Sequence, residues 1–179
     1  MKGRASFGAK SVAVWHPGPE QRERSRLTKA MTAWGFDDLA ELHRYSVDQP
    51  AEFWAKALDD LGIAFDTPWE TFIDTSEGHA FPRWFTGGSL NVAWNCALRH
   101  AQDPEASARP AVIYEGDNGQ RTEMSYATLA SEIERVAAGL NQIGVTKGDR
   151  VAFFMPVIPE AAVAVLACAK IGAIGVPAF

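Results

Sequence analysis

The clearest pattern of apolar and polar positions lies in the second half of the chain. From residue 126 to residue 143 apolar side chains recur in steps of three and four, at Tyr126, Leu129, Ile133, Val136, Leu140 and Ile143. This spacing predicts a one-sided helix, with Ser125 as its N-cap and Gly144 just beyond its end. Ahead of it, residues 111–114 and 121–124 predict a hairpin, because Asp-Asn-Gly at 117–119 is a strong tight-turn signal.

The most apolar region is residues 151–179, and it predicts a strand, a helix and a second strand. Residues 151–155 are apolar on both faces, as a buried parallel strand requires. Two prolines then stop this strand and start a helix of small residues over 160–171, and residues 173–176 predict the second strand. Such a unit belongs to a parallel sheet with both faces covered. Two strands do not make that sheet, so we expect a partner chain or a continuation of the same polypeptide to complete it.

The first half of the chain predicts helices followed by an irregular segment. One helix is expected over 19–34 and a short one over 37–45. The next begins near Pro50, with Asp48 as N-cap, and ends at Gly62. The fold class is therefore mixed α/β, with a helical and extended cap segment ahead of the hairpin, the long helix and the strand–helix–strand unit.

Residues 63–90 carry many aromatic side chains, at Phe65, Trp69, Phe72, Phe81, Trp84 and Phe85. We expect an extended segment here that lies on a larger surface, because aromatic rings of this kind bury much area per residue. Asn91 is expected to cap a helix that runs to about residue 101.

Charge and cysteine content exclude several classes of protein. Residues 1–30 hold seven basic and two acidic side chains, whereas the remaining residues hold 10 basic and 20 acidic ones. An acidic body does not attract nucleic acid, and we expect the basic leader to be a solvated tail or first helix. The two cysteines, Cys96 and Cys168, exclude a disulfide scaffold and a Cys-rich zinc module, and they suit a reducing cytoplasm.

The motifs of common active sites are missing from the sequence. It contains no G-x-x-x-x-G-K-[ST] phosphate loop, no G-x-G-x-x-G fingerprint and no G-x-S-x-G elbow. The four histidines lie far apart, so no metal site is expected. The uncharged runs within 151–179 are nine residues long, too short to span a membrane. From motifs alone we expect no catalytic residue in the chain.

Two long stretches resemble one known family. Residues 82–100 read PRWFTGGSLNVAWNCALRH, which is similar to the W-F-x-G-G-x-L-N segment of acetyl-CoA-synthetase-like enzymes. Residues 148–173 read GDRVAFFMPVIPEAAVAVLACAKIGA, which resembles the G-D-R-V and M-P-x-x-P-E stretch of AMP-forming acyl-CoA synthetases. Residues 45–54, YSVDQPAEFW, resemble the N-terminal S-x-x-x-P-x-x-F-W element of the same family.

The resemblance implies an acid–CoA ligase that uses ATP, coenzyme A and Mg²⁺ and acts on a short or medium carboxylate. It leaves acetate, propionate and acetoacetate open. The implied organisation is a basic leader with the first helix over 1–35, an N-terminal segment over 36–98, and the beginning of the AMP-binding domain over 99–179. By position, Phe179 matches the first aromatic of a turn that contacts the CoA nucleotide in the family, so it is the one expected cofactor-binding residue.

The family's phosphate loop, acyl pocket and adenylation lysine would all lie beyond Phe179, so we expect this chain alone to be inactive. The leading interpretation is the N-terminal portion of a cytoplasmic ligase, with no nucleic-acid or membrane partner. The alternative is a non-catalytic interaction module, or the remnant of a gene, that docks on a partner chain through its open sheet edge. A small Rossmann dehydrogenase is disfavoured by the missing glycine fingerprint.

Overall fold

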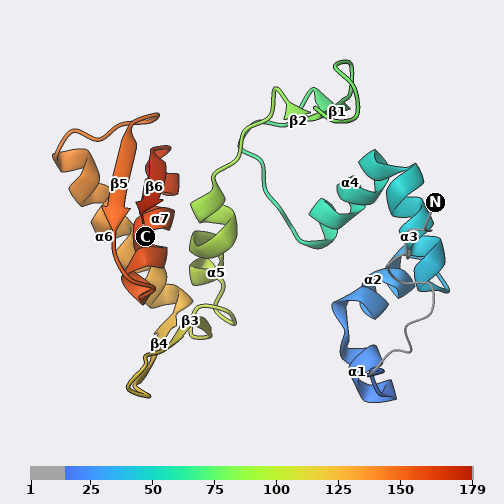
Figure 1. Cartoon of the computed structure of the whole chain (residues 1–179), viewed down its shortest axis with the longest axis horizontal. Helices are drawn as coiled ribbons and strands as arrows, with labels where there is room; N and C mark the ends of the chain where they lie inside the picture. The colour runs from blue at the N-terminus through green and yellow to red at the C-terminus, as the bar shows by residue number, and fades with distance from the viewer. Residues whose placement is uncertain (1–14, 179) are drawn as a thin grey trace, which may run out of the picture. The chain divides into compact units, whose positions relative to one another are not determined.

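The computed structural model describes residues 15–178, and it divides into two compact units, one up to Gly62 and one from Ile63 onward (Figure 1). Among residues 15–178, the first unit has helices as its only regular elements, and all the strands lie in the second.

The first unit contains four helices, namely α1 (Pro19–Arg24), α2 (Arg26–Trp34), α3 (Leu39–Asp48) and α4 (Pro50–Asp60). The expectation of one continuous helix over 19–34 is wrong. At Ser25 the backbone is extended, with ψ at 139°, and its hydroxyl oxygen accepts a 3.0 Å hydrogen bond from the Thr28 N–H. Because a serine side chain can satisfy an amide at a helix start, the chain ends one helix and begins another at this residue.

Helix α3 begins and ends later than predicted, whereas α4 begins at Pro50 as expected but with a different N-cap. Asp38 caps α3 by accepting a 2.8 Å hydrogen bond from the Glu41 N–H. Because α3 continues through Asp48, that residue is not the N-cap of α4; Gln49 holds the position without a side-chain bond, and Pro50 follows it. Gly62 adopts a φ of 62° and donates to the Asp59 carbonyl at the end of α4, as expected.

Aromatic rings hold the first unit together. Within its described part only Leu42 is buried. The Phe53 ring packs edge-on against Trp34, with 5.6 Å between the ring centroids, and its centroid lies 6.4 Å from that of Tyr45. The Tyr45 centroid in turn lies 5.1 Å from that of Phe36. Such pairs contribute about 0.5–1.5 kcal/mol each beyond their buried area. The helices are therefore joined by ring contacts in place of an aliphatic core.

The second unit begins with a hairpin that the sequence did not predict. Strands β1 (Thr71–Asp74) and β2 (Arg83–Thr86) pair antiparallel, with Ile73 opposite Trp84. The rings around them form an aromatic cluster, with neighbouring centroids 4.8–6.0 Å apart, made of Phe65, Trp69, Phe72, Trp84 and Phe85. Five of the six rings that we expected to lie on a larger surface pack against one another, whereas Phe81 is 71% exposed; the larger surface stays a prediction. Phe85 carries a φ of 55°, in the left-handed region that a bulky residue rarely adopts.

The helix after Asn91 is not α-helical throughout. A π-helical turn, η1 (Trp94–Leu98), leads into the short α5 (Arg99–Gln102). The expected cap is present, because the Asn91 side-chain oxygen accepts a 3.2 Å hydrogen bond from the Trp94 N–H. The π turn was not anticipated from the sequence.

The following elements match their predictions. Strands β3 (Pro110–Glu115) and β4 (Arg121–Ser125) form the expected hairpin, with a register shift between Pro110 and Val112. Helix α6 (Tyr126–Gln142) starts at Ser125, whose hydroxyl oxygen accepts from the Thr128 N–H. The apolar face of α6 forms the core of the unit with η1 and α7, and the buried members of that core are Ala97, Leu129, Ile133 and Val163.

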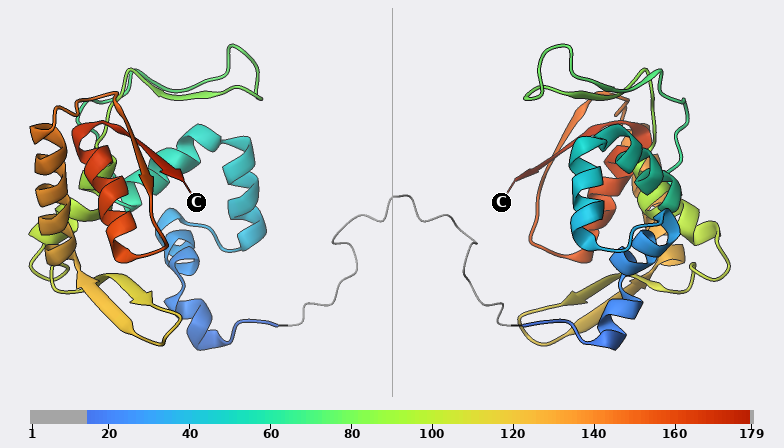
Figure 2. Two further views of the ribbon diagram at one scale, coloured as in Figure 1. Left: turned by 60° about the vertical axis from the view of Figure 1, so that its left-hand side comes forward. Right: turned by 90° about the vertical axis from the view of Figure 1, so that its right-hand side faces the viewer.

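The last three elements form a parallel strand–helix–strand unit. Strands β5 (Arg150–Phe154) and β6 (Ile174–Ala178) pair in parallel, and helix α7 (Pro159–Ile171) packs against both α6 and β6 (Figure 2). Within this chain Phe153 is half-buried while Phe154 is 83% exposed, and the cover that a partner chain or further polypeptide would supply stays a prediction. Ile174 and Val176 are also exposed. One face of this strand pair is therefore open.

Candidate functional site

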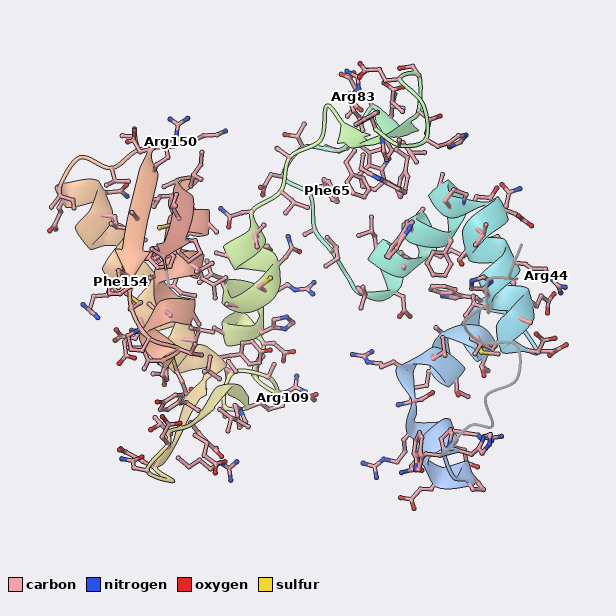
Figure 3. The ribbon with its side chains drawn as sticks, viewed as in Figure 1. Arg44, Phe65, Arg83, Arg109, Arg150 and Phe154 are labelled. Carbon is pink, nitrogen blue, oxygen red and sulfur yellow. The ribbon has the colours of Figure 1, made fainter. Side chains whose placement is uncertain are left out.

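An apolar hollow of about 430 Å³ lies at the carboxyl end of the β5–β6 pair. Its lining comes from the ends of both strands and the first turns of α7, and consists of Phe153, Met155, Pro156, Val157, Ala161, Ala162, Val165, Leu166, Pro177 and Ala178. Figure 3 labels Arg150 and Phe154 at opposite ends of β5, and the hollow lies beyond the Phe154 end. In open α/β sheets, ligands bind at the carboxyl ends of the strands. This hollow is therefore the candidate site.

Local sequence explains why the hollow forms there. Pro156 cannot donate to a continued ladder, so β5 stops, and Pro159 occupies the first turn of α7, where a missing N–H costs nothing. Ala161 and Ala162 then present only methyl groups toward the strand ends. The small side chains leave space that larger ones would fill.

The hollow has no chemistry of its own. Every lining side chain is apolar, so none can exchange a proton or hold a phosphate. What the lining offers is a dry wall against which a ligand or a further layer of protein can pack.

The expected cofactor-binding residue, Phe179, lies outside the described residues. Ala178, the residue before it, lines the hollow. The assignment of Phe179 to a CoA contact stays a prediction.

The ionisable groups with shifted pKa values lie away from the hollow. The pKa of Asp74 falls to about 2, first because its carboxylate accepts from the Ser76 backbone N–H and then because Arg83 donates to it at 2.6 Å. The Thr146 N–H and hydroxyl, both bonded to the Asp149 carboxylate, lower the pKa of Asp149. Each of these carboxylates stabilises a turn by accepting a hydrogen bond from a nearby backbone N–H, that of Ser76 for Asp74 and that of Thr146 for Asp149.

The described part of the chain offers no metal site and no membrane span. Residues 15–178 contain no group of three or more His, Cys, Asp or Glu side chains that could hold a metal ion. Nor does any helix in that range have the length and apolar character needed to cross a bilayer. Cys168 is buried, which raises its pKa, and Cys96 is exposed.

Two asparagines in the W-F-x-G-G-x-L-N stretch have roles that sequence reasoning missed. The Asn91 side-chain nitrogen donates to the Lys170 carbonyl at 3.0 Å, at the end of α7. The Asn95 side chain pairs with both polar groups of the Ala64 main chain, accepting at 2.8 Å and donating at 2.9 Å. These contacts span 31 to 79 positions of sequence, so no local signal could have revealed them.

Comparison with protein families identifies two consecutive matches. Residues 39–96 match the family described as "Acetyl-coenzyme A synthetase N-terminus", and residues 99–179 match the family described as "AMP-binding enzyme". The hollow and the core of the second unit fall largely within the second match.

Curated relatives agree with the family matches. The chain is 39% identical over 161 residues to an acetyl-coenzyme A synthetase of Deinococcus radiodurans, covering 90% of this chain and 23% of that protein. It is 42% identical over 166 residues to an acetyl-coenzyme A synthetase 2 of Pseudomonas aeruginosa, covering 89% and 23%. The chain spans about a quarter of the length of these relatives.

A solved structure shows the same fold. The acetoacetyl-CoA synthetase from Streptomyces lividans superimposes with a TM-score of 0.78 at 31% identity, over 92% of this chain and 26% of that chain. With the two consecutive family matches, this likeness bears out the interpretation drawn from residues 45–54, 82–100 and 148–173. The chain belongs to the AMP-forming acyl-CoA synthetases, in their acetyl-CoA-synthetase-like branch, and corresponds to the N-terminal part of its members.

Proposed function

We propose that this chain serves as the N-terminal part of an acid–CoA ligase that acts on a short or medium carboxylate. In the first step, a carboxylate oxygen attacks the α-phosphorus of ATP and pyrophosphate leaves, which gives an acyl-adenylate. In the second step, the sulfur of CoA attacks the acyl carbon, its proton is released and AMP leaves. The observation that carries the proposal is the pair of family matches in the right order, over residues 39–96 and 99–179.

The role of the described residues in this reaction is structural. The core around Ile133 and Val163 fixes α6 and α7 on the β5–β6 pair, and the pair ends in the apolar hollow. We propose that Phe179, which follows Ala178 in the sequence, makes the CoA nucleotide contact. Since the described residues offer no cluster of metal ligands, Mg²⁺ enters the proposal only as the companion of ATP.

The organisation and location of the protein belong to the same proposal. We propose a leader that includes α1 and α2 over 1–35, the N-terminal segment over 36–98 and the beginning of the AMP-binding domain over 99–179. The remainder of the sheet is supplied by further polypeptide, and the enzyme works in the cytoplasm.

A chimera tests whether the chain can fulfil this role. Residues 1–179 replace the matching region of the Deinococcus radiodurans acetyl-coenzyme A synthetase, and ATP–pyrophosphate exchange is measured with acetate, propionate and acetoacetate. A matched chimera with Ile133→Asp, which places a charge in the core, serves as the inactive control. Residues 1–179 alone are assayed in parallel.

We expect acid-dependent exchange from the chimera and none from the control or from residues 1–179 alone. A chimera that is monodisperse and fully folded by circular dichroism but shows no exchange with any acid contradicts the proposed function. Exchange by residues 1–179 alone contradicts the structural role.

A second candidate function, a non-catalytic interaction module, is favoured by the open face of the strand pair, where Phe154 is 83% exposed and Ile174 and Val176 are 48% and 42% exposed. Patches of exposed apolar side chains mark interaction surfaces. An inactive but well-folded chimera, together with a native product of 19.5 kDa that purifies with another protein, would favour this candidate.

A further inference from the structure

Asn91 caps two helices at once. Its side-chain oxygen accepts from the Trp94 N–H at 3.2 Å, at the start of the helix that contains η1. Its side-chain nitrogen donates to the Lys170 carbonyl at 3.0 Å and lies 3.5 Å from the Ala169 carbonyl, at the end of α7. The first four amides and the last four carbonyls of a helix lack partners within it, so one side chain satisfies both kinds of terminus.

Only a side-chain amide of this length can make both contacts. A carboxylate accepts hydrogen bonds but donates none when ionised, and a serine hydroxyl is too short to extend across to a second helix. Asn91 is half-buried, and its own carbonyl accepts a 3.1 Å hydrogen bond from the Asn95 side chain. Asn95 in turn holds both polar groups of Ala64. Asn91, which hydrogen-bonds to the end of α7, is therefore itself fixed by the hydrogen bond from Asn95.

Helix α7 connects this contact to the candidate site. The helix has 13 residues and is about 20 Å long at 1.5 Å per residue. Its last turn receives the Asn91 hydrogen bond, whereas its first turns supply Ala161 and Val165 to the wall of the hollow, where Ala178 also lies. Because a packed helix moves as a rigid element, a shift at its last turn changes the wall at its first.

We propose that Asn91 is a positioning residue for the CoA-dependent step. By capping both helices it fixes the axial position of α7 and so the wall of the hollow beside Ala178, without touching a substrate. This inference rests on the proposed function and on the predicted CoA contact at Phe179.

The test uses the protein encoded by the native reading frame, purified as the cell makes it. Asn91→Asp keeps the cap oxygen and removes the donor. Asn91→Ser also keeps a cap oxygen and adds no charge, and its hydroxyl is too short to extend to the Lys170 carbonyl. Asn118→Asp is the matched control, because Asn118 lies exposed in the β3–β4 turn and its oxygen, which accepts from the Gln120 N–H, is retained. ATP–pyrophosphate exchange reports the first step, and thioester formation at varied CoA concentration reports the second, both well below the unfolding temperature.

We expect both Asn91 variants to raise the KM for CoA by on the order of tenfold while the exchange rate stays within about twofold of the parent protein. The control should match the parent protein in both assays. If Asn91 only stabilises the fold, the variants lower both rates equally through the folded fraction and leave the KM for CoA unchanged, which overturns the inference. If the parent protein itself shows no acid-dependent exchange, the proposed function fails and this inference falls with it.

Discussion

Truncating Ile133 tests whether the core of the second unit supplies the stability that the structure implies. Ile133 is fully buried near the middle of α6, among Ala97, Leu129 and Val163. Ile143, at the end of the same helix, is 78% exposed. Ile133→Ala and Ile143→Ala therefore remove the same atoms from opposite environments.

The expected difference follows from the loss of buried surface and from the cavity that remains. A buried isoleucine truncated to alanine costs about 2–5 kcal/mol, against a total stability of about 5–15 kcal/mol for a small domain. At Ile143 the change should stay within about 0.5 kcal/mol, because little surface is withdrawn from water there and alanine favours the helix.

Urea unfolding followed by circular dichroism at 222 nm measures both effects. With a slope of about 2 kcal/mol/M, Ile133→Ala should lower the midpoint by about 1–2.5 M and Ile143→Ala by less than about 0.3 M. Equal shifts for the two variants would refute the reasoning, since they would mean that burial does not distinguish the two positions.

Two further predictions concern single turns. Gly172 adopts a φ of 73° at the end of α7, so Gly172→Ala should destabilise the protein by about 1–2 kcal/mol. Gly139 lies in the last turn of α6 with open space around it, so Gly139→Ala should stabilise the protein by about 0.5–1 kcal/mol. Urea midpoints that move the same way for both variants would contradict this. The pKa of Asp74 is about 2, below its unfolded value, so its contribution is present above about pH 4 and is lost as the pH falls toward 2. Since the Ser76 N–H is the larger cause, Arg83→Gln should raise the pKa of Asp74 only in part, as a carboxyl-carbon NMR titration would measure; full return to the ordinary value would contradict the assignment.

Sequence reasoning succeeded where the determinants are local. The helix after Ser125 was predicted from its apolar steps and its cap, and both are present in α6. The turn at 117–119 gave the β3–β4 hairpin, because the residues that favour a tight turn are contiguous. The strand–helix–strand unit was predicted from two apolar runs separated by prolines.

The sequence did not predict features that depend on contacts between distant residues, or on a choice between two local conformations of similar stability. The break at Ser25 lies in a polar run that favours helix on both sides, so only the serine bond to Thr28 decides it. The β1–β2 pair has no alternation and a long connection, and its rings become ordered only through one another. For the candidate site, the apolar hollow follows from the strand ends, but the contacts of Asn91 depend on a helix almost 80 positions away.

Phe85 shows how a residue can be poorly suited to its backbone and still be the best choice for its position. Its φ of 55° is a conformation that glycine adopts freely and that costs a bulky residue about 1–3 kcal/mol. Its ring, however, contacts four neighbours at 5.0–6.0 Å, namely Phe65, Trp69, Phe72 and Trp84. Glycine here would relax the main chain and remove all four contacts at once. The ring contacts therefore offset the cost of the Phe85 backbone conformation. Because that offset exists only when the rings are packed, β1, β2 and the aromatic cluster should form and unfold as one unit.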